Sequence, residues 1–422
     1  MKLTLRQIRR IILALIFLVL AGGVGYYFGK REVTVIPGTP IPKIQIQRII
    51  PPDKQAKADF DLFWLVWDRL EESYLDKSQI NYSKMIHGAI SGMVSSLEDP
   101  YTVFLPPSDN EDAKADLRGD FEGVGIQIGY NQDQMVAVVA PLSGTPAEAA
   151  GIKAGDIITR IVDEKNGVDE DTAGMSLPEA VKLIRGTKGS TVKLMIYREG
   201  LEKPFEVTLK RDTIVVKSVE VNFEEKEGKK IAVLKLSRFG ERTYEEWEEA
   251  VNRIKKEESS AGNAFGGIVF DLRNNPGGFL QGSIFIASEF LSSGVVVQQD
   301  RGDLGKETYS VNRKGKLLKE PLVVLINPGS ASASEIVAGA LKERGRAELI
   351  GEKSFGKGTV QEAEDLPGGA GLHITVARWL LPSGKTIDKE GVSPDYEVKM
   401  DETDQTKDPQ LEKAFEILLN KQ

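Results

Sequence analysis

One segment of the chain has to change from a buried strand to a helix within a few residues. The apolar run Val323–Ile326 predicts a buried strand, and a Pro-Gly turn follows it. From Ser334 to Leu341 the composition favours a helix. Between them Ser330, Ser332 and Ser334 alternate with alanines. At least one serine should therefore lie at a helix N-terminus, where free N–H groups and the helix dipole stabilise negative charge.

A serine nucleophile needs a base, and the chain has two histidines. His87 falls in a helical pattern, and His373 lies in an alternating strand pattern, where a structural role is the simpler interpretation. Lys357, between Gly356 and Gly358, is the alternative base. Burial can lower the pKa of a lysine from about 10.4 toward neutrality, and the neutral amine then accepts the serine proton. A solvated loop lysine is the simpler interpretation of Lys357 taken alone.

These residues belong to a long pattern, made of GSASASEIVAGAL at Gly329–Leu341 and GEKSFGKGTVQ at Gly351–Gln361. The pattern resembles the active-site region of the carboxyl-terminal processing proteases, the tail-specific Ser-Lys peptidases of family S41. The resemblance implies that Ser332 is the nucleophile and Lys357 the general base. It also implies that Gln361 hydrogen-bonds and orients the lysine. The two flanking serines are then capping or packing residues at the helix start.

The amino-acid composition argues against several classes of partner and chemistry. The 422 residues are 41% hydrophobic and 28% charged, which is enough for two or three cores in a multidomain protein. A net charge of −8 argues against a nucleic-acid partner. The chain has no cysteine, which excludes disulfides, thiol catalysis and cysteine-ligated metals. We expect neither a cofactor nor a metal.

The N-terminus predicts a membrane anchor in residues 1–30. Ile11–Gly29 carries no charge, and more basic residues precede it than directly follow it. This predicts a single-pass protein of the cell membrane, with its catalytic body on the extracytoplasmic side. A signal peptide cleaved near 21–23 is the alternative, but the apolar run continues to Phe28. Residues 31–52, with five prolines, predict an extended tether.

Residues 53–115 show helical patterns of apolar side chains, including an aromatic stripe at Phe60, Phe63, Trp64 and Trp67. Their last part, GAISGMVSSLEDPYTVFL, is similar to the sequence that precedes the recognition domain in the same family. The resemblance implies that these helices help to assemble a homodimer or a larger homo-oligomer. A core of aromatic side chains is the simpler alternative.

Residues 116–212 resemble a PDZ domain. Gly123, Val124, Gly125 and Ile126 match its carboxylate-binding loop. The N–H groups of such a loop hold a chain-terminal carboxylate, while the adjoining strand edge pairs with the peptide. The resemblance therefore implies protein substrates with free, apolar C-termini.

Two further features of this region need an interpretation. Gly123, Gly125 and Gly129 look like a dinucleotide fingerprint, but the third glycine is one residue late and no βαβ unit follows. Arg185, in LIRGTKG, matches an arginine that reaches the protease core in the family when substrate is docked. A solvated arginine at the end of an element is the alternative for Arg185.

Residues 213–400 alternate strand and helix patterns, with run-like apolar strands typical of an α/β sheet. Asp271–Gly278, DLRNNPGG, is similar to another family motif. The resemblance implies that the N–H groups of Gly278 and Ala333 form an oxyanion hole, although a tight turn also explains the glycines. Residues 401–422 predict a C-terminal helix. The fold class is α/β multidomain, with an N-terminal membrane anchor, a helical segment, a β-rich PDZ-like domain and an α/β serine-protease core.

Two other functions compete with this interpretation. A penicillin-interacting enzyme would explain Ser354–Lys357, which spells S-x-x-K, and Ser108–Asn110, which spells S-D-N. The two motifs occur in the wrong order, no K-T-G exists, and Ser354 lies in a glycine-flanked loop. A non-enzymatic scaffold with a PDZ-like domain is the other candidate, but all three residues of the expected catalytic site are present.

Overall fold

A computed structural model provides the structure of the chain. Residues 1–30, which carry the predicted membrane anchor, lie outside the described residues. In the part that is described, no helix has the length and apolar character needed to cross a membrane. The chain forms two compact units, Met1–Ile86 and His87–Gln422. The described residues are 31–36 and 43–48, for their backbone alone, together with 60–131, 133–142, 144–400 and 407–420.

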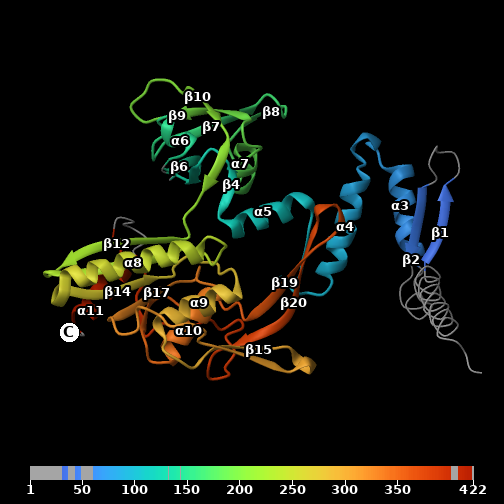
Figure 1. The fold of residues 1–422 in the computed structure, drawn as a ribbon. Coiled ribbons are helices and arrows are strands. Elements are labelled where there is room, and N and C mark those ends of the chain that lie inside the picture. Colours follow the sequence, from blue (N-terminus) through green and yellow to red (C-terminus); the bar gives the residue numbers. More distant parts are fainter. Residues whose placement is uncertain are drawn as a thin grey trace, which may run out of the picture. The chain divides into compact units, whose positions relative to one another are not determined.

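The first unit contains a strand pair and the start of the helical region (Figure 1). Strands β1 and β2 pair antiparallel inside the segment predicted to be an extended tether. This pairing was not predicted, although KIQIQR alternates with the period of two that is typical of strands. The elements are β1 (Arg31–Ile36), β2 (Lys43–Arg48), α3 (Asp61–Ser73), η1 (Lys77–Gln79) and the first part of α4 (Tyr82–Ser95).

Helix α3 carries the aromatic stripe. The ring centroids of Phe63 and Trp64 lie 5.2 Å apart, and those of Trp67 and Tyr82 lie 5.8 Å apart in a stacked arrangement. No residue of α3 is buried, and Trp64 is 55% exposed. In the described chain the stripe is therefore a surface feature and not a core.

The second unit contains the region predicted to be a PDZ domain, which is a six-stranded sheet with two helices (Figure 1). The strand order is β10-β9-β7-β6-β5, with β8 paired to β7, and every pair is antiparallel. The absence of a βαβ unit agrees with the rejection of a dinucleotide fingerprint. β5 is an edge strand, and α7 packs beside it. The elements are β5 (Ile126–Tyr130), β6 (Val136–Pro141), α6 (Pro146–Ala149), β7 (Ile157–Asp163), β8 (Val168–Asp171), α7 (Leu177–Ile184), β9 (Thr191–Tyr197) and β10 (Phe205–Lys210).

A two-stranded ribbon connects this region to the rest of the unit. The ribbon pairs β4 with β11 antiparallel, and Gly123 lies opposite Asp212. β4 runs directly into the predicted carboxylate-binding loop. The elements before and within this ribbon are β3 (Val103–Leu105), α5 (Pro107–Arg118), β4 (Asp120–Gly123) and β11 (Asp212–Val215).

Residues 213–400, predicted to be a protease core, are built on a six-stranded sheet in the order β12-β13-β14-β17-β18-β21. β12 is antiparallel to β13, and the remaining neighbours are parallel. Both faces of the central strands are buried, because Ile268 and Phe270 face one hydrophobic cluster and Val269 faces the other. The predicted run-like strands are therefore confirmed. The elements are β12 (Val219–Lys226), β13 (Lys229–Leu236), β14 (Phe265–Asp271), β17 (Leu322–Ile326), β18 (Glu348–Gly351) and β21 (Tyr396–Glu397).

Helices cover both faces of this sheet. Trp247 of α8, Phe290 of α9 and Val337 of α10 belong to the larger cluster, whereas Phe415 of α11 belongs to the smaller one. The amphipathic α11 thus buries its apolar face on the sheet of its own chain. The helical elements are α8 (Thr243–Ala261), η2 (Gly262–Ala264), α9 (Leu280–Phe290), α10 (Ala333–Glu343) and α11 (Pro409–Asn420).

A second sheet of the core has the order β16-β15-β20-β19, and β3 also pairs with β20. β19 begins just after Lys357, and Val103 of β3 lies opposite His373 of β20. Strand β3, which precedes the PDZ-like region, is thereby joined to β20 of the second sheet. The elements are β15 (Val295–Asp300), η3 (Gly302–Leu304), β16 (Lys306–Ser310), β19 (Thr359–Asp365), η4 (Pro367–Gly369) and β20 (Gly371–Leu380).

Candidate active site

The carboxyl ends of β14 and β17 bring two loops together. The strands are parallel neighbours, and Asp271 lies opposite Leu325. The loops that follow are joined by their side chains: the N–H of Asn274 donates to Asn327 Oδ1 at 2.8 Å, and Asn327 Nδ2 donates to Asn274 Oδ1 at 2.8 Å. The carboxyl edge of a parallel sheet is a common place for a site. Here it holds the glycine turn DLRNNPGG beside the serine cluster.

Ser332 stands directly before the first residue of α10, at the strand-to-helix junction where a serine was predicted. Its backbone has φ 53° and ψ −115°, a conformation that residues with a side chain rarely adopt. Such strain persists where the surrounding structure imposes it, and it is frequent at catalytic residues. Ser332 is partly exposed, whereas Ala331 and Ala333 on either side are buried.

The other two serines of the cluster are fully buried and hydrogen-bonded. Ser330 Oγ donates to the carbonyl of Leu272 at 2.9 Å, and Ser334 Oγ donates to the carbonyl of Asn275 at 2.9 Å. Both bonds tie the start of α10 to the glycine turn. Of the three serines, Ser332 is therefore the one that a substrate can reach.

Lys357 lies in a loop that glycines allow to pack closely. A Cβ on Gly356 would lie 3.0 Å from the nitrogen of Gly391, and one on Gly358 would lie 2.6 Å from Asp388 Cβ. The indole N–H of Trp379 donates to the carbonyl of Lys357 at 2.8 Å. Ser354–Lys357 is loop and not helix, as expected when the S-x-x-K interpretation was rejected.

Burial lowers the pKa of Lys357, and the negative charges of Asp99 and Glu335 oppose that shift. The Lys357 Nζ lies 5.0 Å from the ring centroid of Tyr101. Lys357 also lowers the pKa of His373, in addition to the lowering by burial of the imidazole itself. A solvated loop lysine does not describe this environment.

Gln361 lies on β19, two residues into the strand. Its Nε2 donates to Thr359 Oγ1 at 2.8 Å and to Thr375 Oγ1 at 3.1 Å. Within the described part of the chain, no hydrogen bond joins Gln361 to the Lys357 ammonium. The predicted orienting role of Gln361 therefore stays a prediction.

Glu335 joins the segment of Ser332 to the segment of Lys357, and it was not predicted as a site residue. Its Oε2 accepts from the N–H of Ser332 at 2.8 Å and from the N–H of Lys357 at 3.0 Å. Its Oε1 accepts from Ser354 Oγ at 2.6 Å and from the N–H of Gly356 at 2.7 Å. The side chain is fully buried, and burial raises its pKa although these bonds oppose that shift. The S-x-x-E spacing of a capping box is the sequence signal that would have found it.

The predicted oxyanion-hole residues lie on the two loops that flank Ser332, and their role stays a prediction. Ala333 is the first residue of α10, where backbone N–H groups have no partner within the helix. Gly278 has φ 137°, and a Cβ there would overlap the carbonyl of Phe239. Gly277, which was not predicted, is the glycine that approaches Ser332, since a Cβ on it would lie 2.8 Å from Ser332 Cβ. Both glycines are thus required by close packing.

Two polar residues of the same turn support this arrangement. Asn275 is fully buried; its Oδ1 accepts from the N–H of Gly277 at 2.9 Å, and its carbonyl accepts from the N–H of Ala331 at 2.9 Å. Arg273 bridges Asp271 and Asp408, each at 2.8 Å, and so ties the turn to the start of α11. The asparagine fixes the two loops relative to each other, and the arginine fixes the turn to the C-terminal helix.

Comparisons with known proteins identify the family to which the chain belongs. The profile of peptidase family S41 matches residues 230–398 and that of the PDZ domain matches 114–197, while the profile of the activating protease CtpB N-terminal domain matches 19–108. The carboxy-terminal processing protease CtpA of Bacillus subtilis is 36% identical over 84% of the chain and 71% of that protein. CtpB of the same organism is 33% identical over 95% of the chain and 80% of that protein. The chain belongs to peptidase family S41.

The S41 protease is thus a serine-type peptidase of the carboxy-terminal processing group, with a PDZ domain and an α/β core. A solved structure of a putative S41 protease from Bacteroides fragilis superposes with a TM-score of 0.56 at 18% identity, over 85% of the chain and 97% of that structure. This likeness shows a shared fold.

In the PDZ domain of the S41 protease, two backbone hydrogen bonds hold the predicted carboxylate-binding loop in place. The N–H of Ala147 donates to the carbonyl of Val124 at 3.0 Å, and the N–H of Leu142 donates to the carbonyl of Gly125 at 2.9 Å. Gly125 has φ 78°, and a Cβ there would overlap Thr145. Ile126 begins the edge strand β5. The loop, edge strand and α7 have the arrangement that peptide capture by strand addition needs.

Arg185 caps the C-terminus of α7 next to this loop. Its guanidinium lies 4.5 Å from the ring centroid of Phe121, and its Cγ would be 3.7 Å from a Cβ on Gly123. Arg185 also lines a cavity of about 420 Å³ together with Asn274 and Pro276 of the glycine turn. Arg185 is thus placed beside both the predicted carboxylate-binding loop and the glycine turn next to Ser332.

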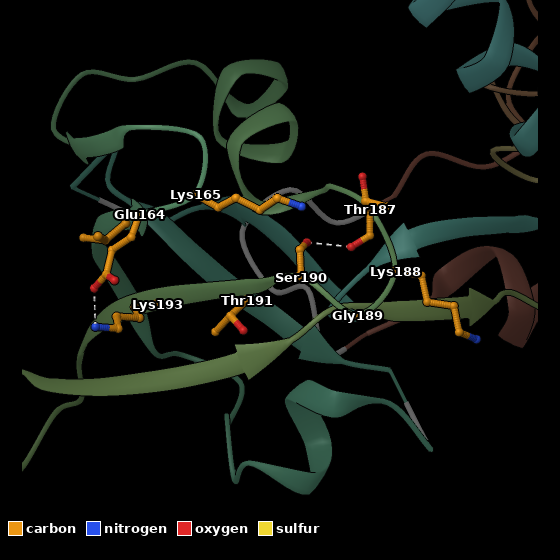
Figure 2. A pocket seen from close by; sticks show the side chains of 9 residues that line it. Glu164, Lys165, Thr187, Lys188, Gly189, Ser190, Thr191 and Lys193 are labelled. Atoms are coloured by element: carbon orange, nitrogen blue, oxygen red, sulfur yellow. Dashed lines mark hydrogen bonds and ion pairs between the residues drawn. The ribbon is translucent and has the colours of Figure 1, made fainter.

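Figure 2 shows a different pocket, of about 540 Å³, which lies entirely in the PDZ domain. Its lysines suggest an anion site. Lys188 is paired with Asp212 and Lys193 with Glu164, each at 2.7 Å. Two of the three lysines are therefore paired with carboxylates, and the pocket shares no lining residue with the site around Ser332.

Proposed function

We propose that the S41 protease is an endopeptidase that captures the free C-terminal tail of protein substrates and cleaves them with a Ser332–Lys357 dyad. The observation that carries this proposal is the link through Glu335, whose Oε2 accepts from the N–H groups of both residues. The reachable serine and the partly buried lysine are thus held by one side chain. The exposed position of Ser332 and the lowered pKa of Lys357 support the same assignment.

In the proposed reaction, the neutral amine of Lys357 takes the proton of Ser332 Oγ as the oxygen attacks the substrate carbonyl carbon. The tetrahedral intermediate collapses, the peptide C–N bond breaks, and the Lys357 ammonium returns the proton to the leaving amine. A water molecule then attacks the acyl-enzyme, again with Lys357 as base, and releases the carboxylate product. The burial of Lys357 supports this role, because it disfavours the charged form that cannot accept a proton.

The negative charge on the attacked oxygen would be stabilised by the N–H groups of Gly278 and Ala333. Donors of this kind typically contribute about 100- to 1000-fold each to turnover. The position of Ala333 at the N-terminus of α10 adds the favourable end of the helix dipole. The close approach of Gly277 to Ser332 supports the placement of this turn beside the reacting carbonyl.

Substrates would bind by adding a strand to the free edge of β5, with the terminal carboxylate at the loop Gly123–Ile126. The edge position of β5 and the neighbouring α7 support this mode. We infer that an apolar last residue is preferred, because the partly buried Ile126, Ile128 and Leu177 pack against the core of this domain. Arg185 would couple tail binding at the loop Gly123–Ile126 to the glycine turn Asp271–Gly278, since it lines a cavity with Asn274 of that turn.

The proposal also includes location and assembly. The uncharged segment Ile11–Gly29, with its preceding basic residues, supports a membrane anchor and an extracytoplasmic catalytic body. The exposed aromatic stripe of α3 supports self-association into a homodimer or a larger homo-oligomer, because a surface of this kind is costly to leave in water.

The test uses one fluorogenic peptide with a free, apolar C-terminus and the same peptide with an amidated C-terminus. We expect rapid cleavage of the free-tailed peptide and much weaker binding of the amide, which lacks the charge that strengthens bonds to the loop N–H groups. Ser332→Ala should bind the free-tailed peptide without cleaving it. Binding without turnover in the wild type would point to a scaffold, and equal cleavage of both peptides would exclude carboxylate capture.

A further inference from the structure

The turn 98–102, which precedes the PDZ domain, contacts the lysine that is proposed as the base. Tyr101 presents its ring to the Lys357 ammonium at 5.0 Å from the ring centroid. This distance lies within the range of a cation–π contact. Tyr101 is partly buried, as is Lys357. The ring therefore occupies a place beside the ammonium that water would otherwise fill.

Hydrogen bonds fix this turn to β20, the neighbour of the strand β19 that begins after Lys357. Asp99 Oδ1 accepts from the N–H of Tyr101 at 3.0 Å, and Asp99 Oδ2 accepts from Thr102 Oγ1 at 2.7 Å. Thr102 Oγ1 accepts in turn from the N–H of Thr375 at 3.0 Å. Thr375 is the residue whose hydroxyl also accepts from Gln361 Nε2 at 3.1 Å.

We propose that Tyr101 and Asp99 are positioning residues for the general base: the Tyr101 ring shields the Lys357 ammonium from water, and Asp99, through its bonds to Tyr101 and Thr102, holds the turn in place and adds a carboxylate to it. The inference rests on the proposed Ser-Lys dyad and deepens it. It gives the turn that precedes the recognition domain a direct part in setting when the lysine is neutral.

Substitutions at Tyr101 and Asp99 should shift the pKa of Lys357 in opposite directions. Leucine is shorter than tyrosine, so Tyr101→Leu opens the outer part of the ring's place to water; this hydrates the ammonium and raises the pKa of Lys357, because desolvation can move a lysine pKa by as much as about 3–5 units. The lost attraction of the ring for the cation has the opposite sign but is worth only about one unit. Asp99 favours the charged lysine, so its neutralisation lowers the pKa of Lys357.

Other charged groups face the lysine and have to be counted. Glu335 opposes the lowering of the pKa of Lys357, as Asp99 does. His373 is held neutral in the alkaline range, because burial and the Lys357 charge lower the pKa of the imidazole. Asp388 acts on Tyr101, whose pKa is raised mainly by burial. Substitutions at Asp99 or Tyr101 leave Glu335, His373 and Asp388 in place, although Asp99→Asn also removes one of the charges that raise the pKa of Tyr101.

The experiment measures the single-turnover cleavage rate against pH for the wild type and four variants. Tyr101→Leu should move the midpoint of the rising limb upward by about one pH unit or more, and Asp99→Asn should move it downward. Tyr101→Phe keeps the ring face and should behave as the wild type. Tyr396→Leu is the matched control. Tyr396 lies on β21 and presents its ring at 5.8 Å to the ammonium of Lys413, which lies on α11.

The results separate this inference from the dyad itself. Activity that survives in Lys357→Ala would overturn the dyad. An inactive Lys357→Ala together with unshifted midpoints in both Tyr101→Leu and Asp99→Asn would overturn only the role of the turn. If circular dichroism shows that Tyr101→Leu does not fold, two other results test the proposal. These are the downward shift of the midpoint in Asp99→Asn and the unchanged pH–rate profile of Tyr101→Phe. Shifts of both variants in the same direction would also contradict the proposal.

Discussion

The backbone N–H of Lys357 donates a hydrogen bond to Glu335 Oε2 at 3.0 Å. The same oxygen accepts from the N–H of Ser332 at 2.8 Å. One buried carboxylate therefore sets the spacing of the two segments that carry the proposed dyad, although neither catalytic side chain touches it through a hydrogen bond among the described residues. We therefore expect the geometry of the site to depend on the charge and the size of the Glu335 side chain.

Glu335→Gln replaces one accepting oxygen with an NH₂ group that faces backbone donors. We expect kcat to fall about 10- to 100-fold with a small change in KM, because bonds to a charged acceptor are the stronger ones. Glu343→Gln is the control, since Glu343 ends the same helix and accepts only from Ser383 in the described chain. An unchanged kcat in Glu335→Gln would show that this link has no part in catalysis.

The pH dependence follows from the lowered pKa of Lys357. The rate of the chemical step should rise with pH and level off above that pKa, because the neutral amine is the active form. The plateau should begin below the range in which an ordinary lysine titrates, near 10.4. Single-turnover rates between pH 6 and 10 check this. A flat profile from pH 6 to 9, with chemistry as the slow step, is incompatible with a lysine base.

Arg185→Ala tests the coupling between the two domains. If Arg185 passes the state of the carboxylate-binding loop to the glycine turn, turnover should fall at least about tenfold while the affinity for the peptide tail changes little. Lys182→Ala, on the same helix, is the control, because Lys182 lines a pocket with Arg185 but does not line the one shared with Asn274. An equal loss of affinity and turnover in Arg185→Ala would assign this residue to tail binding alone.

Gly125→Ala tests the carboxylate-binding loop. The added Cβ would overlap Thr145, so the loop has to move, and the affinity for a free-tailed peptide should fall more than about tenfold. Gly144→Ala is matched for backbone strain, since Gly144 also has positive φ but has open space around it. Fluorescence anisotropy with a labelled peptide measures both. Equal affinities for the two variants would remove the loop from the binding site.

Local patterns predicted the elements of the site better than its contacts. The β-branched run ending at Ile326 and the helix-forming stretch after Ser334 correspond to β17 and α10, because burial and helix propensity act over a few residues. The contact between Tyr101 and Lys357 depends on the pairing of β3 with β20, which no local pattern specifies. The hydrogen bonds of Gln361 to Thr359 and Thr375 depend on the pairing of β19 with β20, which the sequence around Gln361 does not specify.

The most direct test of the central claim is the site and rate of labelling by a serine-reactive fluorophosphonate, located by tandem mass spectrometry. The dyad predicts modification of Ser332, with none on the buried Ser330 or Ser334. It also predicts labelling that is at least about 100-fold slower in Lys357→Ala, because the hydroxyl loses its base. Modification of another serine, or equal labelling rates in the wild type and Lys357→Ala, would contradict the account.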